Sequence, residues 1–270
     1  LPSRVLGWDL APSVSHSRLP YSTDIQGFRR TAPDGSVDPK LPTVAFWGDS
    51  LVHGDEQSNE QSWLWKLQER FSGRLRIVNG GVPGYGSDQG LLRCLQRADE
   101  VNSKVNFLSY ATSDLFRHVN IARPCLNHAA DVPFLKPRYI INSVGGIERV
   151  NPPYTDFDNI VDVIRDPATR DFLAHHDAFF PRPLMQISEK VLRHLDLDLV
   201  IDLRKKRYRE ALEITWKIFD KFLKECDKRH VLGVPILLPM FWGLHPSGGD
   251  FDFLIEHLEQ KGQPYLDLRK

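Results

Sequence analysis

A serine that directly follows a short apolar segment is the residue of this sequence best suited to covalent chemistry. Ser50 ends the segment Gly48-Asp49-Ser50, which follows the apolar residues 42–47. A serine between a buried strand and a helix lies on a sharp turn, where its hydroxyl is exposed and the helix N-terminus favours a developing negative charge. Ser50 is therefore a candidate nucleophile. Asp49 is a candidate supporting residue, and either side chain is also suited to capping the helix.

A glycine-rich segment follows the next apolar segment, residues 75–78. It runs from Asn79 to Gly86. Glycine allows the backbone to approach a ligand closely, so the N–H of Gly84 is a candidate donor to an oxyanion. Asn79 is a candidate supporting residue. A plain turn into the next helix is the alternative, and the Lys-Ser/Thr ending of a phosphate-binding loop is missing.

A third polar motif follows the apolar residues 105–110. It reads Ala111-Thr112-Ser113-Asp114. The Ser113 hydroxyl is a candidate oxyanion donor and Asp114 a candidate supporting residue, although either also suits a helix cap. Because ligand sites of parallel sheets form beyond the carboxyl ends of the strands, the three motifs are expected to face one crevice.

Strands and helices alternate in the pattern that must position these motifs. Apolar segments predict strands at 42–47, 75–78, 105–110, 231–240 and 264–268. Apolar residues at helical spacing predict helices at 60–71, 88–98, 204–227 and 250–260. Such alternation predicts a three-layer α/β/α, flavodoxin-like domain with a parallel sheet of about five strands.

The rest of the chain is divided between an arm and an insertion. Residues 1–41 are rich in Pro, Ser, Asp and Arg, which predicts an irregular arm on the surface of an α/β domain formed by residues 42–270. The pattern breaks over about 115–200. A structureless loop of that length is improbable inside a compact domain, so this segment is predicted to be an insertion.

Composition excludes several classes of protein. Thirty-five Lys and Arg balance thirty-five Asp and Glu, which argues against a broad nucleic-acid footprint. No segment is long and apolar enough to span a bilayer, and three cysteines are too few for a disulfide scaffold. The segment His175-His176-Asp177 has no partner motif with metal-ligand spacing. We expect neither a metal nor an organic cofactor.

The three motifs together resemble those of the SGNH hydrolase family, also called GDSL esterases and lipases. Gly48-Asp49-Ser50-Leu51 matches the first block of the family, and Asn79 to Gly84 matches the second. The resemblance covers about 20–114 and 204–270. Gly27-Phe28-Arg29 and Lys136-Pro137-Arg138-Tyr139 are similar to segments of bacterial exopolysaccharide-associated members.

The resemblance implies serine-dependent ester hydrolysis or acyl transfer without a cofactor. Ser50 would be the nucleophile, and Gly84 with Ser113 would hold the oxyanion. The implied substrates are acetyl or short acyl esters of small molecules or saccharides, and by analogy the protein would be exported, periplasmic or membrane-anchored. In the third block, Ser113 occupies the place of an asparagine and reaches less far than an amide.

The base is the least defined part of the predicted site. The family's Asp-x-x-His block follows the last strand, but no such block follows 264–268, so we expect it beyond Lys270. Within the chain, His245 follows a strand and is the candidate base. Asp227 and His230 have the spacing of the block but precede a strand, at the opposite edge of the sheet.

Two other functional classes remain open from the sequence. The altered third block and the missing Asp-x-x-His block are also compatible with a catalytically inactive SGNH-like domain that binds carbohydrate or acts in assembly. A phosphate- or nucleotide-binding α/β protein is disfavoured because no glycine loop carries a lysine.

Overall fold

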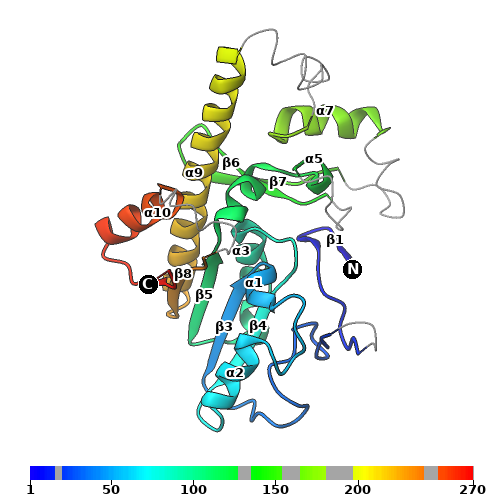
Figure 1. The fold of residues 1–270 in the computed structure, drawn as a ribbon, viewed down its shortest axis with the longest axis vertical. Coiled ribbons are helices and arrows are strands. Elements are labelled where there is room, and N and C mark those ends of the chain that lie inside the picture. The colour runs from blue at the N-terminus through cyan, green and yellow to red at the C-terminus, as the bar shows by residue number, and fades with distance from the viewer. Residues whose placement is uncertain (16–19, 127–134, 154–164, 181–196, 240–248, 270) are drawn as a thin grey trace.

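A five-stranded parallel sheet forms the centre of the fold (Figure 1). The computed structural model describes residues 1–15, 20–126, 135–153, 165–180, 197–239 and 249–269. The strands are β3 (Thr43–Gly48), β4 (Arg76–Gly81), β5 (Val105–Tyr110), β8 (Leu232–Leu237) and β9 (Leu266–Asp267). Their order in the sheet is β4-β3-β5-β8-β9. The chain adds β4 on one side of β3 and then adds β5, β8 and β9 on the other side. This is the flavodoxin-like order, and the predicted fold class is confirmed.

Helices cover both faces of the sheet. They are α1 (Ser50–His53), α2 (Trp63–Arg70), α3 (Ser87–Gln96), α4 (Ala98–Val101), α9 (Leu197–Lys228) and α10 (Gly249–Gln260). Alternate residues of β3 point to opposite faces. Trp47 packs in a core with α3, α9 and α10, whereas Phe46 packs in a second core with Leu64 of α2. The result is a three-layer arrangement.

The region after β5 contains a mixture of short elements. They are the 3-10 helix η1 (Thr112–Val119), α5 (Arg123–Leu126), the antiparallel strands β6 (Arg138–Ile141) and β7 (Ile147–Val150), and α7 (Pro167–His176). Helix α9 begins at Leu197, earlier than the predicted residue 204, because Leu197, Val200 and Leu203 continue its apolar spacing. It therefore extends from the sheet to the β6–β7 hairpin (Figure 1). That 115–200 is an insertion remains a prediction.

The N-terminal arm is packed more deeply than the sequence predicts. It carries the short strands β1 (Pro2–Ser3) and β2 (Gly7–Trp8), and Trp8 and Phe28 belong to the main core. Aromatic side chains in an otherwise polar segment are the reason for this burial.

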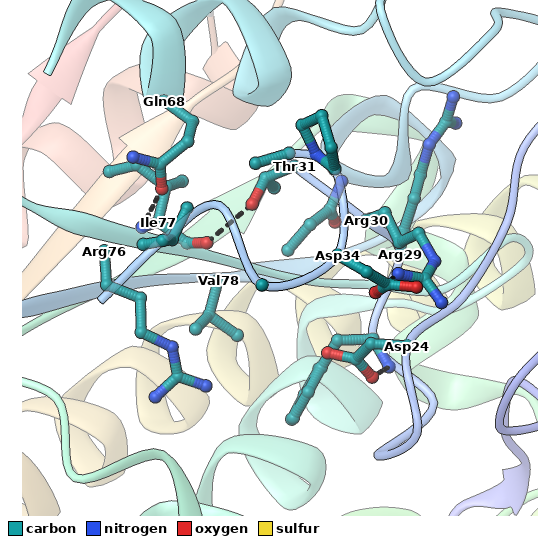
Figure 2. A pocket seen from close by; sticks show the side chains of 15 residues that line it. Asp24, Arg29, Arg30, Thr31, Asp34, Gln68, Arg76, Ile77 and Val78 are labelled. Atoms are coloured by element: carbon teal, nitrogen blue, oxygen red, sulfur yellow. Dashed lines mark hydrogen bonds and ion pairs between the residues drawn. The ribbon is translucent and has the colours of Figure 1, made fainter. Parts of the chain in front are cut away.

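The arm also covers β4, which lies at one edge of the sheet. Arg29 forms an antiparallel bridge with Asn79, and the Thr31 hydroxyl donates to the Ile77 carbonyl at 2.9 Å (Figure 2). A cavity of about 130 Å³ lies between the arm and this strand. None of the residues predicted as nucleophile or oxyanion donors lines it. Among the described helices, none is long and apolar enough to cross a membrane.

Candidate active site

Ser50 lies where β3 turns sharply into α1. Gly48 ends the strand, and a Cβ at this position would overlap the Ser109 hydroxyl and lie 2.8 Å from Cγ2 of Val52. Only glycine therefore allows the strand, the turn and β5 to approach so closely. Ser50 is half-buried, and no other described residue forms a hydrogen bond with its hydroxyl. This hydroxyl is free to react or to bind a ligand.

In the first turn of α1, the backbone N–H groups that follow Ser50 have acceptors among the described residues, whereas that of Ser50 does not. The buried Asp49 caps the helix, because its carboxylate accepts from the Leu51 N–H at 3.0 Å and also from Val52. The His53 N–H donates to the Asp49 carbonyl at 2.9 Å. Within the described part of the chain, the Ser50 N–H has no acceptor, as is usual for the first N–H of a helix. It is available to an anion.

Gly84 lies in the turn after β4 with a φ of +83°, a conformation that favours glycine. The Tyr85 N–H closes this turn on the Val82 carbonyl at 3.2 Å. The Gly84 N–H donates to no described group, so it is a second available donor. Its position at the carboxyl end of β4 agrees with the predicted role but does not by itself test it.

Asn79 joins the glycine turn to α1. It is fully buried, its amide donates to the His53 carbonyl at 3.2 Å, and its side-chain oxygen accepts from the Gly81 N–H at 3.1 Å. Asn79 therefore supports the two loops from behind. It has no exposed group with which to contact a ligand.

The third motif forms the beginning of η1. The Ser113 hydroxyl oxygen is buried and has no hydrogen-bond partner, which is uncommon for a buried polar atom. Asp114 is fully buried, and its carboxyl lies 3.3 Å from the Ser87 hydroxyl and 3.4 Å from the Ala111 nitrogen. Ser113 thus provides a third available donor, and Asp114 supports the turn.

Arg117 brings the three motifs together. Its Nη1 atom lies 3.4 Å from Asp49 Oδ2, 2.6 Å from the Tyr85 carbonyl and 3.0 Å from Asp114 Oδ1. Each of these groups belongs to a residue directly beside Ser50, Gly84 or Ser113. The predicted motifs therefore converge on one guanidinium. Sequence reasoning missed Arg117, although its place three residues after Asp114 puts the two on one helical face.

The two acids at this junction influence each other. Burial raises the pKa of Asp114 well above its ordinary value, and the charge of Asp49 raises it further. Burial also raises the pKa of Asp49, but Arg117 and the two backbone N–H groups oppose this effect. Arg117 lowers the pKa of Asp114 as well, but burial is the largest cause for both acids, so both pKa values stay above the ordinary value.

His118 is buried near this junction but is used for structure. Its Nε2 accepts from the Ser87 N–H at 3.1 Å, so its proton is on Nδ1, which donates to the Thr215 hydroxyl at 2.7 Å. Thr215 in turn donates to the Ala211 carbonyl. Burial lowers the pKa of His118 to about 4, so the ring is neutral near pH 7.

His53 is likewise enclosed. The arm residue Arg29 donates to the carbonyls of His53, Gly54, Gln57 and Ser58. Tyr21 packs edge-on against the His53 ring. Burial, and to a smaller extent the charge of Arg29, lowers the pKa of His53 to about 3. The His53 ring forms no hydrogen bond with the Ser50 hydroxyl, and its Nε2 atom is buried without a partner in the described part of the chain, so His53 is not our candidate base.

The remaining histidine candidates are His245 and His230. His245 lies outside the described residues. Asp227 and His230 are exposed at the amino end of β8, where Leu232 pairs with Val105 at the start of β5, so they lie at the edge opposite Ser50. In the described part of the chain no histidine contacts Ser50, and no cluster of His, Cys, Asp or Glu is arranged to hold a metal.

Comparisons with known proteins yield matches among solved structures alone. No family model and no curated protein matches the sequence. The esterase AlinE4, described as an SGNH-hydrolase family esterase, is 13% identical, with 84% of this chain and 75% of that chain covered and a TM-score of 0.41. A putative acylhydrolase from Bacteroides fragilis is 12% identical, with 88% and 72% covered and a TM-score of 0.39.

Proposed function

We propose that this chain is a serine-dependent ester hydrolase or acyltransferase of the SGNH type, with Ser50 as its nucleophile. The observation that carries the proposal is the convergence of three loops on Arg117, because it places the neighbours of Ser50, Gly84 and Ser113 around one atom. The substrates would be acetyl or short acyl esters of small molecules or saccharides, as the family resemblance implies.

The oxyanion of the tetrahedral intermediate would be held by three donors. They are the N–H groups of Ser50 and Gly84 and the hydroxyl of Ser113, none of which has a hydrogen-bond partner among the described residues. Donors that are already oriented stabilise the charge of the transition state without reorganisation. A serine side chain is shorter than that of asparagine. The oxyanion would therefore lie closer to η1 than it would if an asparagine occupied position 113.

The reaction would proceed through an acyl-enzyme. A base removes the proton of the Ser50 hydroxyl as its oxygen attacks the acyl carbon, and then gives that proton to the leaving alcohol. Water, or the hydroxyl of an acceptor, then attacks the acyl-enzyme and restores the serine. His245 is our candidate base, because it follows β8 in the sequence.

Labelling with a fluorophosphonate probe tests the nucleophile. Intact protein should be labelled, and mass spectrometry should locate the tag on the peptide that contains Ser50. Ser50→Ala should abolish labelling, whereas Ser36→Ala, at an exposed serine of the arm, should leave it unchanged. His245→Ala should slow labelling strongly if this histidine is the base.

Absence of labelling would favour a second candidate function. Ser113 stands in the place of the family asparagine, and no Asp-x-x-His block follows residues 264–268 in the sequence; these two features favour a catalytically inactive SGNH-like domain that binds carbohydrate. If the folded protein neither reacts with the probe nor hydrolyses an acetyl ester, this binding role replaces the proposed enzyme.

A further inference from the structure

Arg123 is a buried cation that has no ion pair in the described structure. Its side chain belongs to the first residue of α5 and is 7% exposed. Its Nε atom is buried without a hydrogen-bond partner, and no described group accepts from the rest of the guanidinium. Burying a charge without a partner is costly, so such groups are rare unless a ligand completes them.

The other buried arginines of the described residues differ from Arg123. They are Arg29, Arg93 and Arg138. Each of them donates to at least one backbone carbonyl, at 2.9 Å, 3.0 Å and 2.9 Å respectively, and thereby holds two parts of the chain together. Among the described residues, Arg123 joins no two segments in this way. The bonds of the described chain therefore do not account for its burial.

The surroundings of Arg123 connect it with the candidate active site. Helix α5, which begins with Arg123, packs against η1, which carries Ser113 and Arg117. The charged groups that act on Arg123 are Arg117 and the carboxyls of Asp114, Asp88 and Asp49. Arg117 bonds two of these carboxyls, and the buried Lys136 pairs with the third. Arg123 therefore lies in the field of these acids, but each acid is already bonded to another cation. Burial, followed by the charge of Arg117, lowers the pKa of Arg123 to about 10, which leaves it charged near pH 7.

The backbone that carries Arg123 is held in place from both sides. The buried Asp177 accepts from the N–H groups of Ile121 and Ala122, at 2.7 Å each. The Lys136 N–H donates to the Ile121 carbonyl at 3.0 Å. These bonds fix the backbone just before Arg123, so the point from which its side chain extends is set before any ligand arrives. Such preorganisation is typical of binding residues.

We propose that Arg123 binds a carboxylate of the substrate, so that the preferred ester carries this negative charge in its acyl or its alcohol part. This inference rests on the proposed function, because it places the charged group beside an ester that Ser50 attacks. A guanidinium matches a carboxylate with two parallel hydrogen bonds, which gives geometric selectivity as well as affinity. The bound carboxylate would supply the hydrogen-bonded counter-charge that no described residue gives to Arg123.

Matched pairs of esters test the proposal. Monoethyl succinate and its amide, ethyl succinamate, differ in charge on the acyl side; acetoxyacetate and acetoxyacetamide differ on the alcohol side. In one of the pairs, the wild-type kcat/KM at pH 7 should be about 10- to 100-fold higher for the carboxylate, as expected for a charge-assisted hydrogen bond. Arg123→Gln should remove this preference, and Arg123→Lys should restore part of it. The pair that responds identifies the side that carries the charge.

Controls separate this proposal from the proposed function. Ser50→Ala should stop all turnover, and Arg74→Gln, at an exposed arginine, should leave the preference unchanged. Arg123→Gln should melt no lower than wild type without ligand, because it removes a buried charge that no described residue bonds. Ser50-dependent turnover of both members of each pair at equal rates would overturn the role of Arg123 and leave the enzyme intact.

If no ester is hydrolysed, ligand binding tests the anion site instead. The Tm of the wild-type protein is measured with monoethyl succinate and with ethyl succinamate. A shift that requires the carboxylate and is lost in Arg123→Gln would keep the anion site while the proposed enzyme fails. Equal shifts, or none with either compound, would overturn the anion site as well.

Discussion

Replacement of Arg117 by methionine should destabilise the protein and disorganise the site together. The variant keeps much of the side-chain volume but removes the atom that joins the three loops. The short contact with the Tyr85 carbonyl and the 3.0 Å contact with Asp114 should dominate the loss, because the 3.4 Å contact with Asp49 is at the limit of a hydrogen bond. Breaking a buried charge pair costs about 3–5 kcal/mol, which corresponds to a Tm lower by roughly 5–9 °C for a chain of this size.

The loss of stability in Arg117→Met should grow as the pH rises. The folded-state pKa values of Asp49 and Asp114 already lie above their ordinary value of 3.8, and without Arg117 they should rise further. A group with a raised folded pKa stabilises the fold below its unfolded pKa and loses that contribution as the pH rises through the folded value. The Tm difference between Arg117→Met and wild type should therefore be smallest near pH 4 and grow toward pH 8.

Calorimetry between pH 4 and 8 measures this difference directly. Arg74→Met, at an exposed arginine, is the control and should melt like wild type. Fluorophosphonate labelling of Ser50 in the folded variant should also slow, because the donors are no longer held together. An unchanged Tm, or a Tm loss that is the same at every pH, would refute the role that we assign to Arg117.

Three further variants test other parts of the structure. Burial raises the pKa of Asp114 in the folded state, so the free energy of unfolding of the wild type should fall as the pH rises above about 4, and Asp114→Asn should reduce this fall. Urea titrations from pH 5 to 8 measure the fall, and an equal fall in the variant would contradict the prediction. Lys136→Met leaves the buried Asp88 without its partner and should cost about 3–5 kcal/mol, whereas a double variant that adds Asp88→Leu should recover more than half of that loss in urea unfolding. Gly48→Ala should cost about 1–3 kcal/mol or more because the new methyl overlaps the Ser109 hydroxyl; Ser109→Gly in the same chain should restore part of it, and a fully stable single variant would show that the turn can relax.

The strands and the turns that follow them are the features that the sequence predicts best. Each predicted strand is present, because a continuous apolar segment between polar turns is a local pattern. The position of Ser50 after β3 follows from that pattern alone. The fold order was predictable for the same reason, since alternating strands and helices permit few arrangements.

Contacts between distant segments were not predictable from these patterns. The convergence of three loops on Arg117 depends on side-chain directions that no periodicity records. Likewise, nothing near Arg123 in the sequence shows that Asp177 holds its backbone or that its neighbouring acids are bonded to other cations. The base of the predicted site remains a prediction, because His245 lies outside the described residues.

The cover that the arm gives to β4 has a consequence for the solubility of the chain. An edge strand with bare N–H and C=O groups is a template for pairing with a second copy. A truncated chain without residues 1–37 would lose the bridge between Arg29 and Asn79 and the bond from Thr31 to Ile77. Such a chain should associate through β4 and precipitate as it refolds, although the other strands of its sheet would be intact. We therefore expect the arm to prevent pairing of β4 between neighbouring molecules.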